Sequence, residues 1–517
     1  MTFEIVFVLV ALTAMVTALA YDIMRPGLVL FCIVVSFLCV GILTPKQVLE
    51  GFSNKGMITV GLLFLVSEGV RQSGALSSLM KNLLPERKAT VRGALVRMLP
   101  SVAAISAFLN NTPVVVIFAP IIKKWAEKMH LPATKFLIPL SYATILGGVC
   151  TLIGTSTNLV VHGMVLDAGY EGFTMFELGK VGVFIALAGI LYLVFFANRL
   201  LPDNRTSHDK ADDDDPMGKI HRVEAVLGPR FPGIRKSLDE FDFYRHYGAI
   251  VREIRRNGRS LDDIGHVPFK EGDTLILYAD DTFIPTWGES SVFLMVSNGT
   301  DYEDKVKHKK ARKWFAMLLL LFMIAGATVG ELPVMREKFP DIKLDMFFFV
   351  CVTTVVMACT KLFPPKKYTK YISWDILITI ACAFAISRAM ESSGFADAIA
   401  SRIIGASHHL GPHVLLAVLF LITNLFTELI TNNAAAALSF PIALSVATQL
   451  GVDPEPFFVV ICMAASASFS TPIGYQTNLI VQGVGNYRFQ DFVKVGLPLN
   501  IIAFVLSVTL IPLFWKF

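Results

Sequence analysis

Two short polar segments within otherwise apolar stretches carry the side chains best suited to bind a ligand. The first reads Asn-Asn-Thr at 110–112, and the second reads Thr-Asn-Asn at 431–433. Because Pro113 lacks a backbone N–H and disfavours helix before it, we expect the chain to turn at 110–112. Peptide groups that leave a helix in an apolar medium must be satisfied by protein, water or a ligand. The two segments are therefore candidate binding sites.

Two further motifs share one glycine-to-asparagine spacing, Gly-Thr-Ser-Thr-Asn at 154–158 and Gly-Tyr-Gln-Thr-Asn at 474–478. Glycine allows a helix to unwind, and the hydroxyl and amide side chains that follow it can then line a cavity. Freed carbonyl oxygens suit a small hard cation, whereas N–H groups, hydroxyls and helix N-termini suit an anion. Neither motif contains Lys or Arg, and neither does either polar segment. We therefore predict that a cation and an anion bind together, because the cation lowers the cost of desolvating the anion.

Glu428 lies three residues before the second polar segment. Ionisable groups at membrane depth are costly and usually functional, so Glu428 is a candidate proton acceptor. The first segment has Ala107 at the corresponding position and offers no acidic partner. A coupling role and a structural role both stay open for Glu428.

The composition places these motifs in a membrane protein. The 517-residue chain is 54% hydrophobic and 17% charged, against roughly 25% charged residues in a soluble domain, and its mean hydropathy is +0.60. Apolar runs at 179–199, 314–332 and 495–515 are long enough to cross a hydrocarbon core of about 30 Å. We therefore expect a polytopic membrane protein, not an enzyme, with no prosthetic group.

Charge and cysteine content exclude other classes of protein. The net charge of +5 is small and the basic residues fall in loops, so nucleic acid is not an expected partner. The seven cysteines lie in apolar segments without CxxC spacing, which argues against disulfides and zinc and favours packing roles. The N-terminal residues 1–21 are expected to form the first membrane pass rather than a signal peptide.

The chain divides into two apolar parts, 1–204 and 313–517, separated by a polar insert at 205–312. The insert opens with an acidic linker at 203–215 and closes with a basic run at 305–313, which marks the cytosolic side of the cytoplasmic membrane. Strands are predicted at 223–227, 247–254 and 274–279, between Gly and Pro residues. The insert is therefore predicted to be a small α+β domain.

Polar anchors recur in the same order in the two apolar parts, as expected for an internal repeat. Residues 67–74 correspond to 387–394, 111–120 to 432–441, 154–158 to 474–478 and 180–182 to 494–496. Each half then contains three full passes, an interrupted segment, a pass broken at the glycine motif and a closing pass. The full passes are predicted at 3–20, 27–43, 56–72, 314–332, 344–361 and 373–389.

If each interrupted segment is a re-entrant hairpin, each half crosses the membrane five times and the second half is inserted upside down. The predicted fold is therefore an all-α polytopic membrane protein with an inverted-topology repeat and two re-entrant hairpins, plus a small α+β cytosolic domain inserted between the repeats. Polar breaks at matching positions of an inverted repeat are typical of secondary transporters.

These motifs resemble those of the divalent anion/sodium symporter family, whose members carry sulfate, dicarboxylates or citrate. The resemblance covers nearly the whole chain outside the insert and implies sodium as the coupling ion. It implies that substrate contacts Asn111, Thr112, Asn432, Asn433 and Gln476, with Thr155, Ser156 and Tyr475 of the glycine motifs lining the same cavity. It also implies two sodium sites, formed by Ser106, Asn110, Asn111 and Gly154 and by Thr427, Ile430, Asn432 and Gly474.

The departures from the family pattern bear on specificity. Neither tip keeps the family's full Ser-Asn-Thr triplet, because Asn110 replaces the serine of the first and Asn433 the threonine of the second. The tip and glycine-motif strings resemble the branch associated with inorganic sulfate. Related members are homodimers in the lipid membrane that move a transport domain against a scaffold, so an elevator-like motion is implied.

Residues 220–297 resemble the C-terminal ligand-sensing domain of potassium-conductance regulators. Domains of that kind pair into dimers and some bind small nucleotides, so a regulatory role with a nucleotide effector is implied; a purely structural insert is the alternative.

A sodium-driven sulfate importer is thus the first hypothesis for the whole chain, and a di- or tricarboxylate carrier is the second. The other hypotheses are a metalloid or proton-linked carrier, an ion channel gated by the insert, and a receptor that only senses the anion.

Overall fold

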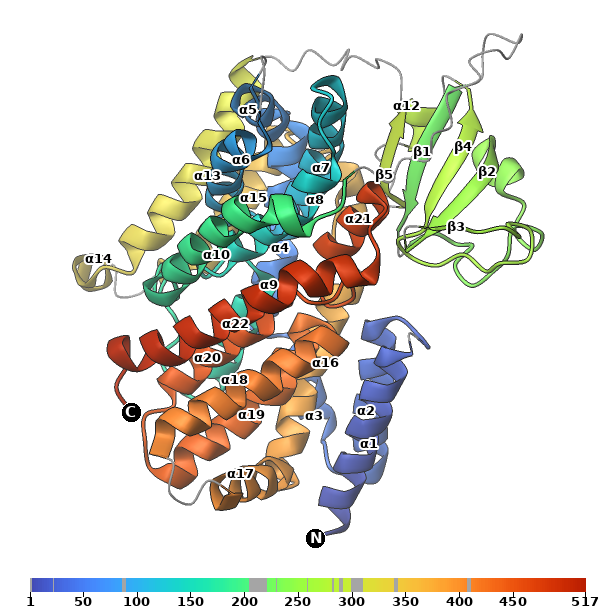
Figure 1. Cartoon of the computed structure of the whole chain (residues 1–517). Helices are drawn as coiled ribbons and strands as arrows, with labels where there is room; N and C mark the ends of the chain where they lie inside the picture. The colour runs from blue at the N-terminus through green and yellow to red at the C-terminus, as the bar shows by residue number, and fades with distance from the viewer. Residues whose placement is uncertain are drawn as a thin grey trace.

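The computed structural model describes residues 2–21, 23–85, 90–203, 221–228, 230–257, 259–280, 283–287, 292–298, 310–338, 343–406 and 411–517. This part of the chain forms a helical body with a five-stranded sheet beside it (Figure 1). Most of the acidic linker (204–215) and the first part of the basic run (305–309) lie outside the described residues.

The helices that precede the sheet include two pairs separated by short breaks, α6–α7 and α8–α9. They are α1 (Phe3–Ala20), α2 (Pro26–Val40), α3 (Pro45–Phe52), α4 (Lys55–Gln72), α5 (Ala75–Leu83), α6 (Val91–Ser106), α7 (Asn111–Lys128), α8 (Thr134–Gly148), α9 (Ser156–Asp167) and α10 (Gly179–Leu200).

The helices that follow the sheet are arranged in a similar order, and α16 to α22 correspond one by one to α4 to α10. They are α13 (Lys310–Gly330), α14 (Pro333–Lys338), α15 (Met346–Cys359), the 3-10 helix η1 (Pro365–Lys370), α16 (Trp374–Ser392), α17 (Phe395–Ala406), α18 (Gly411–Leu429), α19 (Asn432–Leu450), α20 (Glu455–Ser466), α21 (Gln476–Gly485) and α22 (Phe489–Phe514).

Among the described residues, seven helices are long and apolar enough to cross a membrane. The bent pair α16–α17, with an angle of 68°, would make an eighth span, and α2, α15 and α20 are shorter apolar helices. The prediction of a helical, polytopic membrane protein is thus confirmed. Five crossings in each half stay a prediction.

Burial separates the broken helices from the continuous ones. Every residue of α8 and nearly every residue of α20 is buried, whereas α10 and α22 expose large apolar side chains such as Leu187, Leu191, Ile501 and Val505. Backbone that leaves a helix at membrane depth is tolerated only where protein surrounds it. The break after α8 therefore lies in the protein interior, whereas the break after α20 is buried except around Ile473, which is 60% exposed. The exposed apolar side chains of α10 and α22 face outward.

The sheet is antiparallel, with strand order β3-β2-β4-β1-β5. Its core contains several aromatic rings, with Phe231 packed edge-on against Phe241 and Phe269. The strands predicted from the sequence correspond to β1, β2 and β4. The elements are β1 (His221–Leu227), α11 (Phe243–Tyr247), β2 (Ala249–Arg256), β3 (Arg259–Ser260), β4 (Thr274–Ala279), α12 (Phe283–Trp287) and β5 (Phe293–Asn298).

Candidate functional site

The chain turns at the start of each polar segment or just before it, and each turn is closed by the same contact. Ser106 Oγ lies 2.8 Å from the Asn111 side chain, and Thr427 Oγ1 donates to Asn432 Oδ1 at 2.8 Å. In each case a hydroxyl at the end of one helix contacts an amide at the start of the next. The two tips therefore have matched geometry.

The first turn is displaced from the predicted position. α6 ends at Ser106 and α7 begins at Asn111, so the chain turns at 107–110 and Asn111 is helical before Pro113. The expectation of a turn at 110–112 was wrong by a few residues. Proline is tolerated within the first helical turn, because N–H groups there have no intrahelical partner.

Oxygen atoms converge on the Asn111 side chain. Its amide nitrogen, oriented toward Ser106, donates to Ser106 Oγ, Thr144 O and Gly154 O at 2.8, 3.0 and 3.2 Å. Asn111 is 1% exposed and Ser106 is fully buried. With the amide turned the other way, four oxygen atoms face one another, which is a suitable ligand set for a hard cation.

Gly154 and Gly474 make room for these oxygen atoms. A Cβ atom at Gly154 would lie 2.6 Å from Gly148 O, and one at Gly474 would lie 2.4 Å from Thr427 O. Any side chain would therefore collide with backbone oxygen at either position. Both predicted sodium sites thus contain a carbonyl cradle that only glycine leaves open.

Two of the predicted sodium ligands are placed differently from the others. Asn110 precedes α7 and lines a cavity of about 10 Å³, the space of one water, together with Ser67 and Ser156. Ile430 is buried directly after α18. Among the described residues, no group of three or more His, Cys, Asp or Glu could hold a metal ion.

The two halves meet crosswise at the glycine motifs. Thr112 Oγ1 lies 3.5 Å from Gln476 Oε1, and Ser156 Oγ lies 3.2 Å from Asn433 Oδ1. Each tip thus contacts the glycine motif of the opposite half. The predicted substrate residues on α7, α9, α19 and α21 are in this way brought into one cluster.

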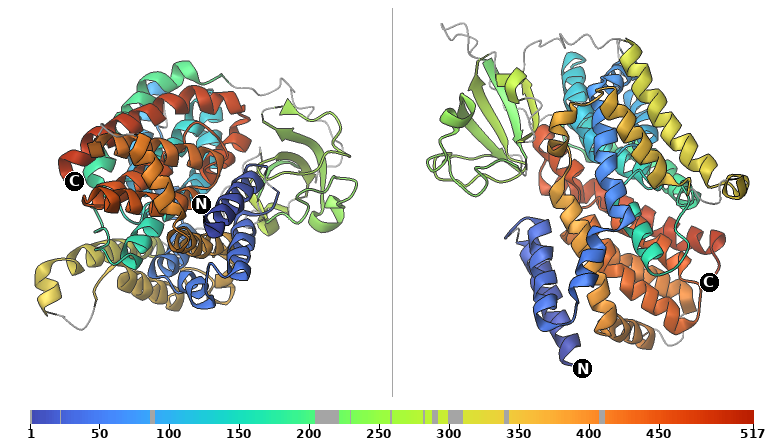
Figure 2. Two further views of the ribbon diagram at one scale, coloured as in Figure 1. Left: turned by 90° about the horizontal axis from the view of Figure 1, so that it is seen from below. Right: turned by 180° about the vertical axis from the view of Figure 1, so that it is seen from behind.

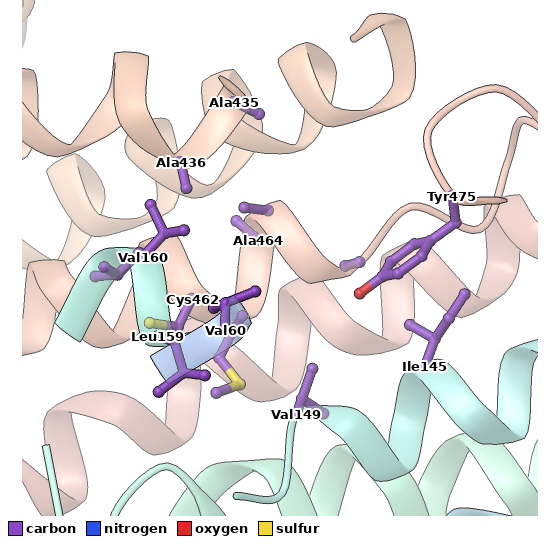
Figure 3. Close-up of a cluster of buried hydrophobic side chains, with 14 of the residues drawn as sticks. Val60, Ile145, Val149, Leu159, Val160, Ala435, Ala436, Cys462, Ala464 and Tyr475 are labelled. Atoms are coloured by element: carbon purple, nitrogen blue, oxygen red, sulfur yellow. The ribbon is translucent and has the colours of Figure 1, made fainter. Parts of the chain in front are cut away.

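Tyr475 lies at the centre of this cluster. Its hydroxyl is 3.2 Å from Thr155 Oγ1 and lies beside the side chains of Asn111 and Asn432. Figure 3 shows the Tyr475 side chain projecting from the segment before α21 toward buried side chains that include Ile145 of α8. The phenol therefore occupies space between the two tips.

Four helices begin at this cluster: α7, α9, α19 and α21, and none of them has a side-chain cap at its N-terminus. Side-chain caps are present at α4, α6 and α15, from Asn54, Thr90 and Asp345, and are also absent at α1, α2, α5, α8, α10, α16 and α20, so what distinguishes the four helices is that their N-termini converge on one cluster. The first N–H groups of a helix have no internal partner and carry partial positive charge. The four N-termini therefore offer uncapped donors to an anion without any basic side chain.

Buried hydroxyl groups without partners also lie at the cluster. Thr431 Oγ1 and Thr477 Oγ1 are buried and make no hydrogen bond with any residue that the structure describes. Such groups are costly unless another partner satisfies them. They are therefore candidate ligand contacts. Thr431 lies in the second predicted polar segment, whereas Thr477 was not predicted as a site residue.

Asn158 and Asn478 were also missed as site residues. Asn158 Nδ2 donates to Thr151 O at 2.9 Å, and Asn478 Nδ2 donates to Thr471 O at 3.1 Å. Each asparagine thus fixes the unwound segment that precedes its own glycine motif. Their recurrence at the fifth position of both motifs was the signal for this positioning role.

Glu428 turns toward the segment before the second glycine motif. Its Oε1 accepts from Ser470 N at 2.9 Å and from Asn500 Nδ2 at 2.7 Å. Its backbone oxygen accepts from Thr471 Oγ1 at 3.0 Å. These contacts connect α18, the 467–475 segment and α22, which favours a positioning role for Glu428.

Comparison with known proteins places the chain among membrane transporters. Residues 5–338 and 334–517 match the family described as citrate transporter. An uncharacterized transporter of Synechocystis sp. is 30% identical, over 93% of this chain and 92% of the relative. An uncharacterized transporter of Escherichia coli is 26% identical over 99% and 100% of the two chains. Sodium/sulfate cotransporter 2 of Chlamydomonas reinhardtii is 23% identical over 94% and 87%.

Proposed function

This chain belongs to the citrate transporter family, and on that basis we propose that it is a secondary transporter that carries sulfate together with sodium. The observation that carries the proposal is the convergence of four uncapped helix N-termini on one neutral polar cluster. N–H groups and hydroxyls suit a small oxyanion, which needs no basic residue when a cation binds beside it.

Sodium would be held by oxygen atoms at the two tips. The first set comprises Ser106, Asn111, Thr144 and Gly154, and the second comprises Thr427, Asn432 and Gly474. The name of the Chlamydomonas relative, a sodium/sulfate cotransporter, supports both the ion and the anion. Because each sodium set shares an asparagine with the anion cluster, bound sodium would order the tips before the anion enters.

Movement across the membrane completes the proposal. The two halves would form an inverted repeat with re-entrant hairpins at α6–α7 and α18–α19, in a homodimer of the cytoplasmic membrane. An elevator-like displacement would then carry the loaded tips from one side to the other. The insert would lie in the cytosol and regulate the displacement.

Uptake into proteoliposomes tests the function. The purified full chain should accumulate labelled sulfate when an inward sodium gradient is imposed, and a potassium gradient should give only background uptake. Unlabelled succinate in excess should not compete. Sulfate uptake that is independent of sodium would contradict the coupling, and the absence of sulfate uptake would contradict the substrate.

A carboxylate carrier is the second candidate, because the matching family is described as a citrate transporter. The same experiment separates the two. Strong competition by succinate or citrate would favour the carboxylate and exclude the narrower proposal.

A further inference from the structure

A second cavity lies between the sheet and the helical body, away from the tips. Its volume is about 140 Å³, and it is bordered by β2, the segment before β4 and the last two turns of α21. Figure 2 shows the sheet beside the helical body. The cavity is large enough for a tetrahedral oxyanion and several waters, because about 10–15 Å³ of such volume holds one water.

The charged side chains around this cavity are three bases, Arg255, Arg256 and Lys270, and two carboxylates, Glu271 and Asp273. Arg256 donates through Nε and Nη2 to Asp273, at 2.7 Å in both cases, and through Nη2 to Pro268 O. Its Nη1 group has no partner among the described residues. Lys270 is exposed and forms no ion pair with any residue that the structure describes. A fixed guanidinium and a free ammonium favour an anion over a cation.

Amide side chains close the cavity on the side of α21. Gln482 Nε2 donates to Asn257 Oδ1 at 3.0 Å, which leaves the Asn257 amide nitrogen available to a ligand. Thr274 Oγ1 donates to Gly483 O at 2.9 Å, so β4 contacts the same end of the helix. The carboxylate of Asp273 is 1% exposed and is occupied by Arg256 and the Lys270 backbone, so it does not repel an anion at close range.

α21 connects this cavity with the tips. The helix has ten residues, begins at Gln476 beside Thr112 and ends at Gly485 beside the sheet. A ten-residue helix is about 15 Å long and transmits displacement as a rigid element. A ligand between the sheet and Gln482 therefore acts on the helix that presents Gln476 to the substrate cluster.

We propose that this cleft is a second anion site, which binds a small tetrahedral oxyanion between Arg256, Lys270 and Asn257 and couples its occupancy to α21. The coupling, but not the binding site itself, rests on the transport function proposed above. The oxyanion is either the transported sulfate, which would make the cleft a feedback site, or inorganic phosphate from the same compartment.

Equilibrium dialysis of the full chain without sodium tests the site, because the tip cluster needs sodium and the cleft does not. Wild-type protein in choline buffer should bind labelled sulfate or labelled phosphate. Lys270→Gln should weaken this binding about tenfold, the effect of losing one charge-assisted contact. Lys236→Gln removes the same charge from an exposed position outside the cavity and should leave binding unchanged.

Hydrogen–deuterium exchange of residues 474–485 tests the coupling to α21. Exchange should slow when the anion binds to wild type, and the slowing should be lost in Lys270→Gln at the same anion concentration. Binding of phosphate alone supports the site and excludes feedback by sulfate. The absence of sodium-free binding of either anion, or equal weakening by both lysine variants, overturns the site whether or not the chain transports sulfate.

Discussion

Thr155 Oγ1 and Tyr475 Oη lie 3.2 Å apart, although the two residues are separated by 320 positions and occupy the same place in their motifs. Side chains at corresponding positions of two halves can meet only near the axis that relates the halves. The contact therefore supports the proposed two-fold repeat. It also shows an asymmetry, because one half contributes a small hydroxyl side chain and the other a phenol.

This asymmetry predicts that Tyr475 sets the size of the anion. Tyr475→Thr makes the second motif match the first at this position and removes the ring from the cluster. We expect the variant to gain succinate uptake, because an extended dicarboxylate then has room between the tips. Tyr475→Phe keeps the ring and should still exclude succinate, while sulfate uptake falls about fivefold through loss of one hydrogen bond. Exclusion of succinate by both variants would contradict a size-limiting role.

The matched asparagines predict that either tip is indispensable. Asn111→Ala or Asn432→Ala removes the side chain that closes the tip, and both are nearly fully buried. Sodium-driven sulfate uptake should fall about 10- to 100-fold, the effect of losing one or two polar contacts. Asn198→Ala, at an exposed position near the end of α10, is the control and should transport normally. Near-normal uptake by both tip variants would remove the site assignment.

The backbone oxygen atoms around Gly474 predict that a side chain at this position weakens sodium binding more than sulfate binding. Gly474→Ala places a Cβ atom 2.4 Å from Thr427 O and 2.0 Å from Ser468 Oγ, so the backbone must move. The sodium concentration for half-maximal uptake should rise at least tenfold, and saturating sodium should restore part of the sulfate transport. Gly451→Ala is a poor control because Gly451 has a positive φ. Ala447→Gly, which lies in α19 away from Gly474, is the better control for Gly474→Ala. An unchanged sodium dependence in Gly474→Ala would exclude Gly474 from the sodium site.

Much of this arrangement could be predicted from the sequence because the polar anchors recur. The segment 274–279 was predicted as a strand with the observed bounds of β4, and 3–20 as a helix with those of α1. The crosswise contacts, such as Ser156 with Asn433, could not be predicted, because they depend on how the halves pack. The absence of side-chain caps at α9 and α21 could not be predicted either. The residues at the two N-cap positions are Thr155 and Tyr475, and their hydroxyl groups contact each other rather than the backbone of the following helix.

The contact between the sheet and α7 predicts a pH dependence of stability. Lys123 forms an ion pair with Glu224, which lies in β1 outside the membrane spans. Burial raises the pKa of Glu224, but the charges of Lys123, Arg222 and Arg255 outweigh it and hold the pKa below its usual value. The stabilisation is therefore present above the unfolded-state pKa, about 4.3, and is lost as the pH falls through the lower folded-state value.

Glu224→Gln should thus destabilise the docked sheet by about 1–2 kcal/mol at pH 7. Thermal unfolding of wild type and variant should differ at pH 7 and converge as the pH falls below about 4. Glu253→Gln, which removes a carboxylate paired within β2, controls for charge loss in the sheet alone. A difference that persists unchanged at low pH would show that the ion pair is not its cause.

Glu428 offers a test between proton coupling and positioning. Its Oε1 accepts two hydrogen bonds, from Ser470 N and Asn500 Nδ2, that hold the segment leading to Gly474. Glu428→Gln keeps a carbonyl oxygen in place of Oε1, so we expect sulfate uptake within about threefold of wild type and an unchanged pH profile. Glu428→Ala removes the acceptor and should reduce uptake more than tenfold, because two donors are left unpaired. If the Gln variant loses uptake as fully as the Ala variant, or if its uptake no longer changes with pH where that of wild type does, then the carboxylate takes part in coupling and the positioning role is insufficient.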